Sequence, residues 1–230
     1  MDNENILVSS ATDIEKATFY KKTYQHLALA ILAFIVVESV LVKTVPVEVI
    51  LWMFSGRFIW LFIIGLFWLG SVLSNKLAYH PSREKQYLGL GLYVILESII
   101  FLPMIYIAAG YSGSSDILMQ AAMTTLFMFT GLTAVVFLTK TDFSFLRTIL
   151  IVGGFVSLGT IVVGAIFGFN LGLWFSVGMV VLASISILYQ TDQIKNKYGT
   201  QQYVGASLQL FASVMLLFWY ILRILMSRRN

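Results

Sequence analysis

Residues 87–108 read YLGLGLYVILESIIFLPMIYIA, a run of 22 residues in which Glu97 is the single charged side chain. A run of about 20 apolar residues is what an α-helix needs to cross the hydrocarbon core of a bilayer. A helix also satisfies its own backbone N–H and C=O groups, which lipid cannot do. The sequence therefore predicts a membrane-spanning helix here, and the fold depends on how many such runs the chain contains.

Seven such runs are found in the chain of 230 residues, of which 59% are hydrophobic and 11% are charged. Soluble domains are typically 45–50% apolar and about a quarter charged. The composition excludes a water-soluble enzyme and a disordered chain, and the long unbroken runs argue against a β-barrel, whose strands alternate. We predict an all-α transmembrane protein, a seven-helix bundle, with spans near 24–42, 58–75, 87–108, 117–138, 145–167, 171–189 and 203–222.

Two domains of unequal size are expected. Residues 1–22 form a polar segment, in which Thr12 and Glu15 have the spacing of a capping box and predict a short amphipathic helix. Residues 23–230 form the seven-span transmembrane domain. Within it, residues 45–54 are apolar but too short to cross, so we expect an interfacial or half-membrane segment there.

The distribution of Lys and Arg predicts the orientation of the bundle. Cytoplasmic loops of membrane proteins carry the excess of these residues. Of the 15 in the chain, ten lie on the side of the N-terminus and five on the other side, which predicts an N-terminus inside and a C-terminus outside. The ten are Lys16, Lys21, Lys22, Lys76, Arg83, Lys85, Lys140, Arg147, Lys195 and Lys197; the five are Lys43, Arg57, Arg223, Arg228 and Arg229.

Two carboxylates lie well inside the apolar runs, and both are candidates for an ion pathway. Glu97 is near the middle of the third run, and Glu38 is in the first run, five residues before Lys43. A charge at membrane depth costs several kcal/mol and usually marks function. Alternatively, Glu97 is a protonated packing residue and Glu38 snorkels toward Lys43. Pro103 frees a backbone carbonyl in the run of Glu97, which suits either a cation path or a packing kink.

Several kinds of functional site are not expected, because the chain lacks the residues that they require. The chain has no cysteine, and its two histidines, His26 and His80, lie at span ends. No lysine lies inside a run to form a Schiff base with retinal, and the motifs of intramembrane aspartyl and serine proteases are missing. We expect no enzyme, catalytic residue, metal site or cofactor. Nucleic-acid binding is not expected either, since no polar domain presents a basic patch.

Four motifs in the C-terminal third of the chain resemble those of a known protein family. They are KTDFSFL at 140–146, YQTDQIK at 189–195, LQLFAS at 208–213 and FWYILR at 218–223. Together, in this order, they resemble the Bax inhibitor-1 family (transmembrane Bax-inhibitor-motif proteins) in its bacterial form. The resemblance implies a C-terminal helix at the centre of the bundle, a bacterial inner membrane and a pH-dependent calcium leak. The implied partners are the lipid bilayer and calcium or other cations, while protein partners are not indicated.

The family's pH sensor is a pair of aspartates on the sixth and seventh helices that share a proton. The first aspartate matches Gln190. The second matches Ser213 if the alignment is anchored on the C-terminal motif, or Phe211 if it is anchored on residues 208–210. None of these residues is acidic, so we predict that gating by this pair is lost.

Two further polar residues stand at helix ends, Asp192 and Lys76. Asp192 does not restore the pair, because two residues along a helix turn the side chain by about 200° from Gln190. We expect it to belong to an ordinary solvated helix end, near Lys195 and Asn196.

The leading hypothesis is thus a multi-pass membrane protein with a cation leak and without the aspartate pair. The alternatives are a proton-coupled transporter that uses Glu97 and Glu38, and a non-conducting stress-response or interaction protein.

Overall fold

A computed structural model describes residues 6–111 and 116–227 of the chain. The described residues form a short 3₁₀ helix, η1, and eight α-helices. In chain order they are η1 (Val8–Ser10), α1 (Asp13–Thr44), α2 (Val47–Phe54), α3 (Arg57–Ala78), α4 (Arg83–Tyr111), α5 (Asp116–Leu138), α6 (Leu146–Phe167), α7 (Gly172–Asn196) and α8 (Tyr203–Ser227).

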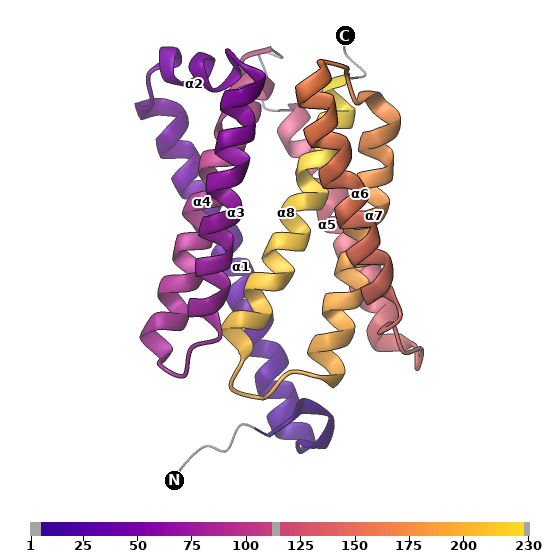
Figure 1. Cartoon of the computed structure of the whole chain (residues 1–230). Helices are drawn as coiled ribbons and strands as arrows, with labels where there is room; N and C mark the ends of the chain where they lie inside the picture. Colours follow the sequence, from indigo (N-terminus) through magenta and orange to yellow (C-terminus); the bar gives the residue numbers. More distant parts are fainter. Residues whose placement is uncertain (1–5, 112–115, 228–230) are drawn as a thin grey trace.

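Seven of these helices are long and apolar enough to cross a membrane, and each coincides with one of the predicted runs to within one residue or contains it. The prediction of an all-helical, seven-span protein is therefore confirmed. The exception among the α-helices is α2, eight residues long, which corresponds to the short segment at 45–54. It lies across the end of the bundle opposite the N-terminus (Figure 1) and buries Ile50 completely.

The capping box at the start of α1 is present. The Thr12 side chain accepts a hydrogen bond from the backbone N–H of Glu15, and the Glu15 carboxylate accepts one from the N–H of Thr12 at 2.8 Å. From this cap α1 continues for 32 residues without a break, so its polar first turns and the first span are one helix. α4 likewise continues through Pro103.

The C-terminal helix lies at the centre of the bundle. α8 runs between α1, α3 and α4 on one side and α5 and α7 on the other, and it packs against all five (Figure 1). α6 is peripheral, since it packs against α7 and α3 and is the span with the least buried apolar window. The predicted central position of the last span is thus confirmed, with α6 as an outer helix.

The packing inside the bundle is largely aromatic. The ring of Phe101 on α4 stacks on Phe218 at 5.8 Å and meets Trp219 edge-on at 4.9 Å, while Phe34 on α1 contacts Phe101 edge-on at 5.2 Å. The outer faces are apolar too, because the lipid tails around a membrane protein are as apolar as its core. Phe127, for example, is 82% exposed.

α3 and α4 approach each other most closely at Gly89. A Cβ atom added there would lie 2.6 Å from the backbone oxygen of Ser74 and 2.7 Å from the backbone nitrogen of Ala78. Because both atoms belong to backbone, this close approach requires a glycine.

Candidate functional site

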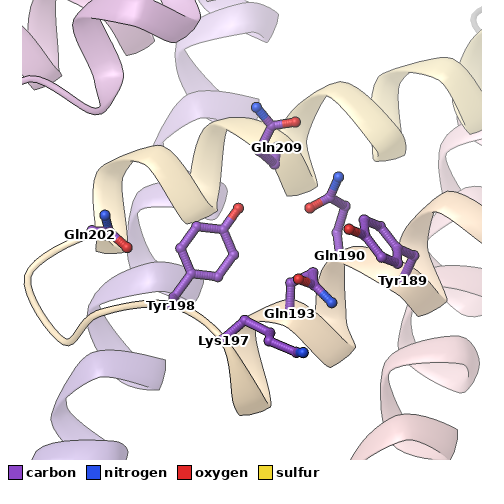
Figure 2. A pocket seen from close by; sticks show the side chains of 7 residues that line it. All are labelled: Tyr189, Gln190, Gln193, Lys197, Tyr198, Gln202 and Gln209. Atoms are coloured by element: carbon purple, nitrogen blue, oxygen red, sulfur yellow. The ribbon is translucent and has the colours of Figure 1, made fainter. Parts of the chain in front are cut away.

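A polar pocket of about 340 Å³ lies where α7 ends and α8 begins. It is at the end of the bundle that carries the N-terminus, which we call the amino-terminal end. Figure 2 shows its side chains gathered between the two helices and the loop that joins them. The lining residues are Tyr189, Gln190 and Gln193 of α7, Lys197, Tyr198 and Gln202 of the loop, and Gln209 of α8.

The antiparallel packing of α7 on α8 positions the two central glutamines. The hydroxyls of Ser186 and Ser213 are 2.8 Å apart across the interface, which fixes the register of the two helices. Four residues further along α7 is Gln190, and four residues back along α8 is Gln209. One helical turn from the serine contact, these two therefore come to the same level, where both line the pocket.

The chemistry of the pocket is that of neutral polar groups. Four amides, two phenols and the Lys197 ammonium line it, and no carboxylate does so. An amide supplies both a carbonyl acceptor and N–H donors and does not ionise in the physiological range. The four amides of the pocket therefore keep one charge state.

Gln209 also connects the pocket to α3. Its amide nitrogen donates a hydrogen bond to the side-chain carbonyl of Asn75. Next to this pair, the hydroxyl of Tyr79 lies 2.9 Å from that of Tyr198, and the two rings stack at 6.3 Å. Burial, followed by the neighbouring Tyr79 phenol, raises the pKa of Tyr198 well above its usual value.

The segment before α1 holds the loop of the pocket in place. The N–H of Val8 donates to the carbonyl of Tyr198 at 2.9 Å, and the N–H of Thr200 donates to the carbonyl of Ile6 at 2.9 Å. The two bonds flank an antiparallel bridge between Leu7 and Gly199. We call residues 6–11 the N-terminal strap. Val8 is fully buried, so the strap is part of the packed structure.

The structure separates the two candidates for the second aspartate position. Ser213 faces α7, where its hydroxyl contacts Ser186. Phe211 points elsewhere, and its ring contacts Phe34 of α1 and Tyr93 of α4. Ser213 is thus the residue that shares the α7–α8 interface with Gln190, and it is 4% exposed.

Neither of the carboxylates predicted for an ion pathway lines the pocket. Glu97 is buried on α4 one turn after Tyr93, whose hydroxyl interacts with its carboxyl group. Glu38 is 4% exposed on α1, and both of its carboxyl oxygens are buried without a hydrogen-bond partner among the described residues. The two acids therefore belong to the bundle interior, apart from the glutamines.

The expectation of a solvated helix end at Asp192 is wrong, because this residue is 1% exposed. α5 and η1 pack against α7. The side chain of Asn196 donates to the Asp192 carboxylate at 2.9 Å. Lys195 does not pair with it, since its ammonium donates to the carbonyls of Val136 and Thr139 at the end of α5.

The remaining helix-end candidate, Lys76, is exposed in the last turn of α3. Within residues 6–111 and 116–227, no three His, Asp or Glu side chains converge as a metal site would require.

Of the seven pocket residues, only Gln190 was predicted as a site residue from the sequence; Gln209, Gln202 and Tyr198 are among those that were missed. Gln209 interrupts an apolar stretch at Leu208 and Leu210, and a lone amide within a span is a usable signal. Gln202 and Tyr198 lie in a loop, where polar side chains are ordinary and give no signal.

The fold and the pocket define a multi-pass helical membrane protein whose last two helices build the polar site. Comparison with known proteins then identifies the family. The family described as "Inhibitor of apoptosis-promoting Bax1" matches residues 16–230. The chain therefore belongs to the Bax inhibitor-1 family, as the motifs predicted.

A similar bacterial protein is PA2604 of Pseudomonas aeruginosa (strain PAO1), which is described as uncharacterized. It is 34% identical over 123 residues, or 53% of this chain and 55% of the relative. The match thus spans about half the length of that relative.

Proposed function

We propose that this protein is a passive cation leak of a bacterial inner membrane, permeable to calcium, in which the aspartate-pair pH sensor is absent. The observation that carries the proposal is the neutral character of the α7–α8 interface. Gln190 matches the family's first aspartate, and Ser213 matches the second when the alignment is anchored on the C-terminal motif. Gln209 is a further neutral side chain in the pocket that Gln190 lines.

The pocket has the chemistry of an ion vestibule. Hard cations such as calcium prefer oxygen ligands, and amide carbonyls supply them. Ion pathways often use neutral oxygens because binding must be weak enough for the ion to leave. Gln190, Gln193, Gln202 and Gln209 offer four such oxygens at the amino-terminal end.

A closed gate lies next to this vestibule. Ser186 and Ser213 are in hydrogen-bond contact one turn deeper, and Leu217 and Phe101 beyond them are fully buried or nearly so. We infer that conduction needs α7 and α8 to separate at the serine contact. In the absence of the aspartate pair, this separation would not be driven by protonation at Gln190 or Ser213.

The test is calcium flux into proteoliposomes that contain the full chain, measured between pH 6 and pH 8. We expect a flux that changes little across this range, and a lower flux in Glu97→Gln, because Glu97 is a buried acid of the bundle interior and a candidate for the ion pathway. The matched control is Glu84→Gln, an exposed carboxylate in the first turn of the same helix. A steep pH response that survives Glu97→Gln would contradict the proposal.

The converse experiment restores the pair. In the double variant Gln190→Asp with Ser213→Asp, flux should become pH-dependent, because two carboxylates at one interface cannot both ionise cheaply. Gln202→Asp with Ser213→Asp adds the same charges with one of them on the loop, and should not gain this dependence. Failure of the first variant to respond to pH would remove the basis for placing the sensor here.

A proton-coupled carrier is the second candidate function, and Glu38 is the observation that favours it. A buried carboxyl group without a partner is a possible proton site. A carrier needs a pH gradient to move its substrate, whereas a leak needs only the gradient of the ion. Calcium flux that persists after the pH gradient is collapsed with an ionophore would support the leak. No flux under any condition would favour the non-conducting interaction protein instead.

A further inference from the structure

A second polar cluster, on another face of the amino-terminal end, has no role in the proposed leak. It consists of Lys22 and His26 on α1, Arg83 and Tyr87 on α4, and Tyr203 on α8. We call it the basic-aromatic cluster. His26 lies against both rings, at 5.5 Å from Tyr87 and 5.0 Å from Tyr203. Three helices that are far apart in the sequence thus contribute to one surface site.

Two cations lie over the ring of Tyr203 in this cluster. The guanidinium carbon of Arg83 is 4.3 Å from the centroid of the Tyr203 ring, and the Lys22 ammonium is 5.1 Å from it. Two positive charges beside one ring repel each other, and a bound anion would relieve this repulsion. Within the described residues, the contacts found for Lys22 and Arg83 are with rings, amides and carbonyls, and none is with a carboxylate.

Hydrogen bonds hold these side chains in fixed directions. Arg83 donates to the side-chain oxygen of Gln86 at 2.6 Å and to the carbonyl and side-chain oxygens of Gln201 at 3.0 Å each. A guanidinium has five N–H groups, so two are left for a ligand after these three bonds. His26 lies 2.7 Å from the carbonyl of Lys22 and 3.1 Å from the hydroxyl of Tyr87. The arginine fork is therefore anchored and still able to bind.

The depth of the cluster matches that of lipid headgroups. Tyr87 and Tyr203 are the first residues of the apolar runs 87–108 and 203–222, and His26 is near the start of the run 24–42. The beginning of a span is where a helix leaves the headgroup region, and tyrosine is enriched there. Directly beyond the cluster, Leu29 and Leu88 are 60% and 62% exposed, so the surface turns apolar where acyl chains begin.

From these observations, we propose that the basic-aromatic cluster binds the phosphate headgroup of an anionic phospholipid in the leaflet at the amino-terminal end. Arg83 and Lys22 neutralise the phosphate, Tyr87 and His26 border it, and Leu29 and Leu88 contact the acyl chains. Clusters of basic residues at a membrane surface attract anionic lipids in this way. The exposed apolar surface beside the cations favours a lipid over a free phosphate ion, because the free ion has no apolar part to contact that surface.

The test uses the purified full chain in detergent and native mass spectrometry with added phosphatidylglycerol. Lys22→Gln should weaken phosphatidylglycerol binding about five-fold, the value of one lysine beside an anionic surface. Lys22 is exposed, and within the described residues its side chain makes a ring contact and no hydrogen bond, so this variant is expected to fold. Lys21→Gln is the matched control, because it removes the same charge from the next exposed residue, and it should leave binding nearly unchanged.

Two further arms separate the sources of phosphate. Phosphatidylcholine, with a zwitterionic headgroup, should bind the wild type more weakly than phosphatidylglycerol does. Millimolar inorganic phosphate should not displace the lipid. Equal losses in Lys22→Gln and Lys21→Gln, equal binding of the two lipids, or displacement by inorganic phosphate would each overturn the proposal. Arg83→Lys keeps the charge but loses the fork, and weaker binding with an unchanged thermal midpoint would support the assigned geometry.

Discussion

At the residue scale, position 190 shows how one functional group sets the behaviour of an interface. A carboxyl at this site would exchange protons near neutral pH if another carboxyl faced it. The amide of Gln190 keeps a similar size and hydrogen-bonding capacity but has one charge state. Around it are Gln209, Gln193 and Tyr198, which are neutral as well. The interface around Gln190 is therefore polar, and its amides keep one charge state.

Glu38 leads to a prediction about stability. A buried polar group without a partner costs about 1–3 kcal/mol. Replacing Glu38 by Met removes this cost and keeps the volume, so the thermal midpoint of the detergent-solubilised protein should rise. If Glu38 serves a proton or ion pathway, the flux should fall in the same variant. Glu48→Met, at an exposed carboxylate of α2, is the control and should change neither. A lower midpoint for Glu38→Met would show that the carboxyl group has a stabilising partner.

Tyr198 leads to a prediction about pH. Since burial raises its pKa above the value of about 10 expected for the unfolded chain, the stabilisation is fully present below pH 10 and is lost as the pH rises through the folded pKa. Tyr198→Phe removes the hydrogen bond to Tyr79 and should cost about 1 kcal/mol at pH 7. Between pH 9 and pH 11 the wild type should lose stability more steeply than the variant. If the thermal midpoints of the wild type and Tyr198→Phe fall equally over this pH range, the prediction is contradicted.

At the scale of the helices, the contact of α3 with α4 is predicted to depend on the absence of a side chain at Gly89. Gly89→Ala places a methyl group against the backbone of Ser74 and Ala78, and overpacking of this kind costs about 1–3 kcal/mol. Gly91, two residues away on the exposed side, has no atom within 4 Å of an added Cβ. Gly91→Ala should therefore be neutral or stabilising, by up to about 1 kcal/mol. Thermal melts of the two variants should move in opposite directions, and equal shifts would argue against the close approach.

The helices themselves were predictable from the sequence, because a membrane span depends on local composition. The run at 87–108 is apolar whatever its neighbours are, and so is each of the others. The capping box of Thr12 and Glu15 was predictable for the same reason, since its residues are three apart. The packing of one span against another depends on residues that are far apart in the sequence. It could therefore not be predicted from the residues.

The candidate site shows that limit clearly. Gln190 was identified through the motif at 189–195, but its neighbour Gln209 depends on the register of α7 against α8. Asp192 was expected in solvent because it is near a helix end, and it is buried because α5 and η1 pack against that end. The basic-aromatic cluster joins residues 22 and 203, a separation that no spacing rule covers.

At the scale of the whole molecule, the N-terminal strap joins residues 6–11 to the loop of the pocket. Val8→Asp would bury a charge at a fully buried position and should detach the strap. We expect a lower thermal midpoint and faster hydrogen exchange at the amides of Val8 and Thr200, while Ser9→Asp, exposed in the same segment, should have little effect. Unchanged exchange in Val8→Asp would show that the loop is held without the strap.

The orientation of the bundle can be tested directly, because the chain contains no cysteine. Ser10→Cys and Ser227→Cys introduce single thiols at the two ends, and both positions are exposed. A membrane-impermeant maleimide added to intact cells should label Ser227→Cys, and should label Ser10→Cys only after permeabilisation. The opposite result would reverse the orientation predicted from the ten and five basic residues.

The central position of α8 has a consequence for biosynthesis. A ribosome delivers the other seven α-helices first, and the helix against which most of them pack arrives after them. Until then the earlier spans surround a space that lipid or a membrane chaperone must fill. Assembly of the native bundle is therefore a late event, and a defect in α8 should leave a protein that is inserted in full but quickly recognised by membrane proteases.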